Sequence, residues 1–179
     1  MTVFRCLVAC RPRLPSSAIH ISHFSTTART QARNQIYDSV RNPDQFYTYQ
    51  LLSSSSRTPL LTLWTTSWCP TCRVVEPLLR DLVSSGLGED EGGVAYCPVE
   101  YDAPDIMAAG LGHEYLITTV PTLLSFDAGE AQVETKVVDG RKLADRRFLE
   151  EWIRTEARRH GNRGAGGSNA FWKGLFGKK

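Results

Sequence analysis

The chain has 179 residues, of which 41% are hydrophobic and 22% charged, as in an ordinary globular domain with extensions at its ends. The net charge of +2 gives little reason to expect nucleic-acid binding, and no apolar run approaches the ~20 residues of a membrane-spanning helix. Five cysteines are too few and too oddly spaced for a small secreted disulfide scaffold.

Residues 1–34 have the composition of a mitochondrial transit peptide. Five arginines and many Ser and Thr residues precede Asp38, the first acidic residue. A secretory signal fits poorly because Arg5 interrupts the short apolar stretch. The stretch "HFSTTAR" is similar to the ends of fungal mitochondrial presequences. We expect a disordered targeting segment and a mitochondrial matrix protein; the alternative is a basic disordered tail.

The first half of the domain alternates strand and helix patterns. We expect a short strand over 35–40, and a helix that is capped by Asn42, begins at Pro43 and ends before "SSSSR". The apolar run "LLTLW" at 60–64 predicts a buried strand. A helical pattern then covers 73–86, with Pro77 expected to kink it.

The second half predicts strands over 94–101 and 119–126, a "DAGE" hairpin turn, and a returning strand over 132–140. Helices are expected over 103–112 and 143–159, with His113 and Glu114 in a solvated loop. This order predicts an α/β domain over 35–160, with a mixed central sheet flanked by helices and an antiparallel part at the hairpin.

The motif "SWCPTC" places two cysteines between a strand and a helix. The unpaired N–H groups and dipole of the helix N-terminus favour an anion, so the pKa of Cys69 should be lowered and Cys69 should supply the thiolate. Cys72, one turn further on, could attack a mixed disulfide formed at Cys69. Trp68 would shield one side of the sulfur.

Two other uses of the cysteines stay open. A zinc site would need Cys97 and His113 to join Cys69 and Cys72, because the domain has no second C-x-x-C. A structural disulfide closing so small a loop would stabilise the fold little. We expect neither a metal nor another cofactor.

The chain resembles the thioredoxin family over about residues 36–158, and is similar to fungal mitochondrial thioredoxin-domain proteins. The resemblance rests on Trp68-Cys69-Pro70-Thr71-Cys72, on Pro77 five residues later, and on Val120-Pro121-Thr122 followed by "LLSF". It implies a thioredoxin-like fold and a monomeric thiol–disulfide oxidoreductase. Protein thiols or disulfides would be its substrates, and a reductase or oxidant of unknown identity its redox partner.

The resemblance also implies roles for individual residues. Cys69 would be the nucleophile and Cys72 the resolving thiol, and the two would form the redox disulfide. Trp68, Val120 and Pro121 would bind substrate. A cis peptide bond before Pro121 would leave the backbone N–H and C=O of Val120 free to pair with an extended peptide.

Several positions depart from the family pattern. Pro70-Thr71 replaces the usual Gly-Pro between the cysteines, and Thr62 and Leu63 stand where thioredoxins carry a buried aspartate. Cys97-Pro98 lies in the region of the usual strand lysine. We expect Cys97 to pack as a small core residue, and a third redox cysteine is the alternative. Because the buried aspartate is absent, a non-catalytic adaptor or a redox-sensing module is the alternative function.

Residues 161–179 form a Gly-rich basic tail that ends in "NAFWKGLFGKK". The opening "GNRGAGGS" is too rich in glycine to fold alone, so the segment should be flexible. Two hypotheses remain for its end, a solubilising tail or an aromatic and basic anchor that touches an anionic membrane or a partner groove.

The transit-peptide hypothesis predicts a shortened mature protein. Import should remove roughly the first 25–35 residues, because the basic, acid-free composition ends in this region. N-terminal sequencing of the endogenous protein checks this. An intact Met1 on protein purified from mitochondria would contradict it.

Overall fold

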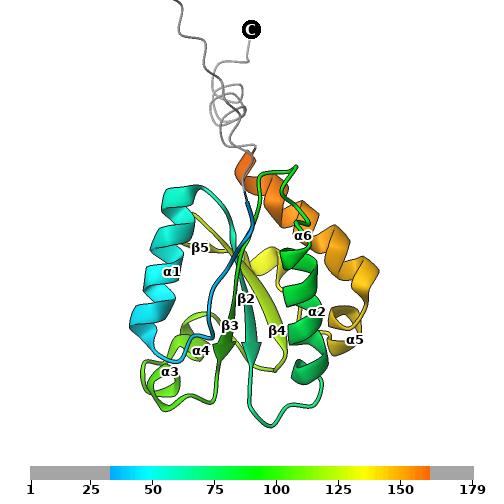
Figure 1. Ribbon diagram of the computed structural model, residues 1–179. Coiled ribbons are helices and arrows are strands. Elements are labelled where there is room, and N and C mark those ends of the chain that lie inside the picture. Colours follow the sequence, from blue (N-terminus) through cyan, green and yellow to red (C-terminus); the bar gives the residue numbers. More distant parts are fainter. Residues whose placement is uncertain (1–32, 162–179) are drawn as a thin grey trace, which may run out of the picture.

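The computed structural model describes residues 33–161, which fold as one α/β unit (Figure 1). The elements alternate between strand and helix in the first half and end with a C-terminal helix. In chain order they are β1 (Gln35–Ile36), α1 (Pro43–Ser56), β2 (Leu60–Thr65), α2 (Cys72–Ser84), β3 (Ala95–Glu100), α3 (Pro104–Ala108), α4 (Leu111–Glu114), β4 (Thr122–Asp127), β5 (Glu130–Ala131), a 3₁₀ turn (Val133–Thr135), α5 (Gly140–Leu143) and α6 (Arg146–Gly161).

The strands form one mixed sheet in the order β1-β3-β2-β4-β5. β1, β3 and β2 run parallel, whereas β4 is antiparallel to both β2 and β5. The predicted mixed sheet and its antiparallel hairpin are therefore confirmed. All six residues of the central strand β2 are buried, because helices cover both faces of the sheet.

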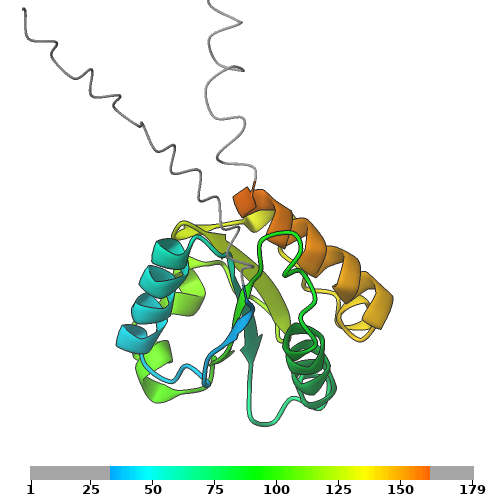
Figure 2. The same cartoon turned by 45° about the horizontal axis from the view of Figure 1, so that its top comes forward.

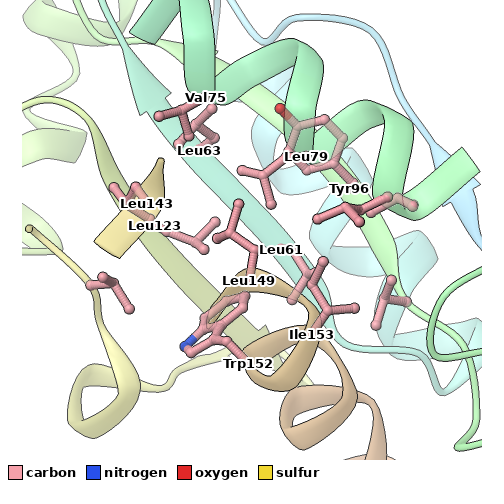
Figure 3. Packing of buried hydrophobic residues seen from close by; sticks show 14 of the residues in the cluster. Leu61, Leu63, Val75, Leu79, Tyr96, Leu123, Leu143, Leu149, Trp152 and Ile153 are labelled. Carbon is pink, nitrogen blue, oxygen red and sulfur yellow. The ribbon is translucent and has the colours of Figure 1, made fainter. Parts of the chain in front are cut away.

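Helices lie on both faces of the sheet, with α1, α3 and α4 on one side and α2, α5 and α6 on the other (Figures 1 and 2). Figure 3 shows the core beneath α2 and α6, where Leu61 and Leu63 of β2 meet Leu79, Tyr96 and Ile153. The opposite core gathers Phe46, Trp64, Cys97, Leu124 and Phe126. Successive β2 residues thus serve two separate cores.

Helix α1 begins where the sequence predicted but ends later. The side chain of Asn42 accepts a hydrogen bond from the Gln45 N–H at 2.9 Å, and Pro43 occupies the first turn. The serines expected to end the helix belong to it, and the Ser56 hydroxyl bonds back to the Leu52 carbonyl at 2.8 Å. Arg57 ends the helix in the left-handed conformation.

Two predicted elements, one in each half of the domain, were too long. The strand over 35–40 shrinks to Gln35–Ile36, and Val40 rejoins β3 only through an isolated bridge to Val99. The helix over 103–112 is two short helices, because Gly110 adopts a left-handed φ of 71° between them. The predicted helix over 73–86 is α2, which continues through Pro77.

The strand predicted over 132–140 was wrong for most of its length. After the two-residue strand β5 the chain turns through the 3₁₀ segment, whose Thr135 carbonyl accepts a hydrogen bond from the Trp152 indole at 2.9 Å. The Gln132 N–H still donates to the Ser125 carbonyl of β4 at 2.8 Å, and further on Val137 returns to the sheet, with both of its backbone bonds to Leu123 at 2.9 Å. Packing against α6 replaces strand pairing here.

The single helix predicted over 143–159 is divided in two. Leu143 belongs to α5, and α6 starts afresh at Arg146. The Asp145 carboxylate accepts a hydrogen bond from the Arg147 N–H at 3.0 Å, which satisfies a free donor at the start of α6. The break lets Leu143 and Leu149 enter the same core.

Truncating Phe46 to alanine should strongly destabilise the domain. Its ring is fully buried, with centroids 5.5–5.8 Å from those of Trp64, Tyr115 and Phe126. We expect a loss of about 3–5 kcal/mol in the free energy of unfolding, measured by urea titration. Leu51→Ala on the same helix, 71% exposed, is the control and should change it by less than about 0.5 kcal/mol. Equal effects would contradict this packing.

Candidate active site

The two motif cysteines lie where the chain passes from β2 to α2. They form a disulfide, with their Cα atoms 5.3 Å apart, and both are buried. Helix α2 begins at Cys72 rather than at Cys69, which lies in the preceding turn. The Cys72 N–H donates a hydrogen bond to the Cys69 sulfur at 3.2 Å. This N–H belongs to the first helical turn, where backbone donors have no partner within the helix.

The loop before the cysteines is tied to the rest of the domain by Asp102. Its carboxylate accepts hydrogen bonds from the Ser67 N–H at 3.0 Å and the Ser67 hydroxyl at 2.7 Å. The Ser67 hydrogen bonds hold the pKa of Asp102 below its usual value. The Arg73 guanidinium also donates to the Ser67 carbonyl at 3.1 Å. These bonds fix the residue that precedes Trp68.

An apolar groove of about 350 Å³ lies next to the motif. Trp68 and Val120 both line it, and Trp68 is 68% exposed. The bond between Val120 and Pro121 is cis, as predicted. Within residues 33–161 the N–H and C=O of Val120 have no hydrogen-bond partner, so they are available to an extended peptide.

Tyr101 and Ile117 complete the apolar wall of this groove. The Tyr101 ring packs so closely on Gly112 of α4 that a β-carbon at that position would overlap it. Sequence patterns did not single out Tyr101, Ile117 or Gly112, because the groove joins segments that are distant along the chain.

Cys97 lies apart from the redox pair. It is fully buried on β3 in the core beneath α1, whereas α2, which carries Cys72, covers the other face of the sheet. Burial raises the pKa of the Cys97 thiol well above its usual value. The prediction that Cys97 packs as a core residue is confirmed.

Neither of the two residues expected at the position of the family's buried acid carries a carboxylate. Leu63 packs in the core beneath α2, and Thr62 faces the opposite core. The Thr62 hydroxyl donates to the Leu124 carbonyl at 2.9 Å and accepts from the Trp64 indole at 3.1 Å. On β3, Tyr96 shares the face of Leu63.

His113 and Glu114 are exposed, as predicted, but they belong to the short helix α4 rather than to a loop. Within residues 33–161, no group of three or more His, Cys, Asp or Glu side chains is arranged to hold a metal ion. In the same part of the chain, no helix is long and apolar enough to cross a membrane.

Thioredoxins are among the solved structures that are similar to this domain. Oxidised thioredoxin O1 from Arabidopsis thaliana is 23% identical, with a TM-score of 0.53 over 69% of this chain and 99% of its own. Thioredoxin h from Nicotiana alata is 16% identical, with a TM-score of 0.53 over 69% of this chain and 94% of its own. No family model and no curated protein sequence matches the chain. The described domain therefore has the thioredoxin fold.

The three cysteines of the domain should react very differently with iodoacetamide. After reduction, the pH dependence of Cys69 alkylation should give a thiol pKa below the ordinary ~8.5, because the Cys72 N–H stabilises the Cys69 thiolate. Cys97 should react only after denaturation, because burial opposes its ionisation and access. Labelling across pH, read by peptide mass spectrometry, checks both, and equal reactivity of the three thiols would contradict the arrangement.

Proposed function

We propose that the protein is a thiol–disulfide oxidoreductase that acts on protein thiols or disulfides through Cys69 and Cys72. The main observation in support of this proposal is the disulfide at the start of α2, which lies beside a groove lined by Trp68 and Val120. The thioredoxin fold of the domain supports the same function. The arrangement combines a redox couple with a surface for a peptide.

In the reducing direction, the Cys69 thiolate attacks a substrate disulfide. A mixed disulfide forms at Cys69, and the first substrate sulfur leaves and takes a proton from solvent. Cys72 then loses its proton and attacks the Cys69 sulfur, which releases the second substrate thiol. Two electrons pass from the cysteine pair to the substrate. The Cys72 N–H stabilises the Cys69 sulfur whenever it carries negative charge.

The groove favours an extended peptide with an apolar side chain near its cysteine. The free N–H and C=O of Val120 can pair with the peptide backbone like those of an edge strand. Trp68 offers a flat apolar surface beside the redox pair, and Tyr101 and Ile117 line the remainder of the groove. Pro121 follows Val120 and fixes the backbone direction at this point.

We further propose that the protein works as a monomer and that it lies in the mitochondrial matrix, a location that the composition of residues 1–34 supports. Residues 1–32 of that segment lie outside the described residues, as does the tail from residue 162 with its proposed membrane or partner contact. The direction of electron flow depends on the reduction potential of the cysteine pair. A value near ~−270 mV would indicate a reductase, and one of ~−120 to −180 mV an oxidant or isomerase.

The competing hypothesis is a thioredoxin-fold adaptor without turnover, and the apolar Leu63 in place of a buried acid favours it. Reduction of insulin by the purified full chain in dithiothreitol discriminates the two. An oxidoreductase accelerates the precipitation of insulin, whereas an adaptor leaves the uncatalysed rate unchanged.

Replacing Cys72 with serine should trap the protein on its substrates. Cys69 could still attack, but no thiol would resolve the mixed disulfide, so covalent complexes should accumulate. We expect non-reducing gels and mass spectrometry of pulldowns from mitochondria to show partner peptides linked to Cys69. Cys69→Ser/Cys72→Ser and Cys97→Ser are the controls, and neither should trap partners. Absence of any Cys69-linked peptide from the Cys72→Ser sample would contradict the exchange mechanism.

A further inference from the structure

A second, polar cavity of about 280 Å³ touches the resolving cysteine. Its lining includes Cys72, Thr66 and the two carboxylates Glu76 and Glu100. The cavity is large enough to hold water molecules, and its polar walls would retain them. The apolar groove shares Thr66 with this cavity but contacts neither Cys72 nor these carboxylates.

Glu76 lies one helical turn after Cys72 on α2. Residues four apart on a helix share a face, and both side chains line this cavity. The Glu76 side chain is half-buried, and within residues 33–161 its carboxylate has no hydrogen bond or ion pair. The buried Thr66 hydroxyl, in the same lining, also has no partner in the described part of the chain. The unpaired Glu76 carboxylate therefore belongs to the same cavity lining as Cys72.

The other charged side chains that line the cavity have hydrogen-bond or ion-pair partners. Glu100 forms an ion pair with Arg41 at 2.9 Å, and Arg73 donates to the Ser67 carbonyl. Arg41 and Arg73 are exposed, so the cavity reaches solvent. Within the described residues, Glu76 is thus the carboxylate of this lining that forms no ion pair.

The core beneath α2 is mainly apolar. Leu63 and Val75 are fully buried there, and Tyr96 of β3 is a polar side chain in the same core. Burial raises the pKa of Tyr96 strongly, and the charge of Glu76 raises it further while Arg80 lowers it. Tyr96 therefore stays protonated in the folded protein. The polar cavity, which Cys72 lines and which reaches solvent, therefore offers a route for a proton leaving Cys72.

We infer that Glu76 accepts the proton of Cys72 through a water molecule in this cavity and so activates the resolving thiol. The inference rests on the proposed oxidoreductase function. When Cys72 attacks the Cys69 sulfur, a Cys69–Cys72 bond forms and the bond to the substrate sulfur breaks. The Cys72 proton passes to the Glu76 carboxylate and then to solvent, and the departing substrate thiolate takes a proton from solvent. In the reverse direction Glu76 returns the proton to Cys72.

The two steps of exchange can be timed separately with dithionitrobenzoate. The reduced full chain, with Cys6 and Cys10 replaced by serine, should release one thionitrobenzoate when Cys69 attacks and a second when Cys72 resolves the mixed disulfide. Stopped-flow absorbance follows both phases. We expect Glu76→Gln to slow the second phase by about 10- to 100-fold at neutral pH, the scale of a positioned general base. The first phase should change less than about twofold.

The pH dependence separates proton transfer from a structural effect. Without the carboxylate, the second phase depends on spontaneous ionisation of Cys72. The difference in its rate between the unmodified chain and Glu76→Gln should therefore shrink as the pH rises toward an ordinary thiol pKa of ~8.5. Glu76→Asp should recover part of the rate. Asp81→Asn removes a charge from the same helix outside the cavity and should leave both phases unchanged.

The outcomes are distinguishable. A second phase slowed less than twofold in Glu76→Gln, or slowed equally at every pH, would overturn the role of Glu76. Failure of the unmodified pair to release the second thionitrobenzoate would instead overturn the proposed function.

Discussion

The whole arrangement depends on the double-sided burial of strand β2. Its six residues are hydrogen-bonded to β3 on one side and β4 on the other, and none reaches solvent appreciably. Leu61 and Leu63 anchor the core beneath α2, while Trp64 anchors the one beneath α1. These contacts fix the position of Thr65, the last residue of β2, and the loop that carries Cys69 begins directly after it. The Asp102 bonds to Ser67 then limit the motion of the first turn outside the sheet.

Two hollows of opposite polarity flank the motif, and they suit the two halves of an exchange reaction. The groove by Trp68 is apolar and offers free backbone groups, as a peptide substrate requires. The cavity by Cys72 is lined by charged groups, as proton transfer requires. In the proposed mechanism, this arrangement would let the groove take an apolar peptide segment while solvent still reaches Cys72. The apolar Leu63 then need not abolish turnover.

The elements with strong periodicity could be predicted from sequence. β2, α2 and the motif at their junction follow from one apolar run, one helical pattern and the C-x-x-C spacing. The segment over 132–140 could not, because its β-branched residues at 133, 135 and 137 alternate as in a strand, while the contact between Thr135 and Trp152 decides its path. The redox pair and cis Pro121 followed from motifs. Glu76 and Thr66 did not, because a glutamate on an amphipathic helix is normally solvated, and only the fold shows the cavity beside it.

The missing side chain at Gly112 has a consequence for the width of the groove. Gly112 lies on α4, outside the groove lining, yet it provides the space that the Tyr101 ring occupies. A methyl group at this position would force the ring away from α4, and Tyr101 is itself part of the groove wall. Under the proposed function, a substitution at position 112 would then change which side chains fit the groove, although Gly112 is not part of the groove lining. Both cysteines would keep their positions and their chemistry.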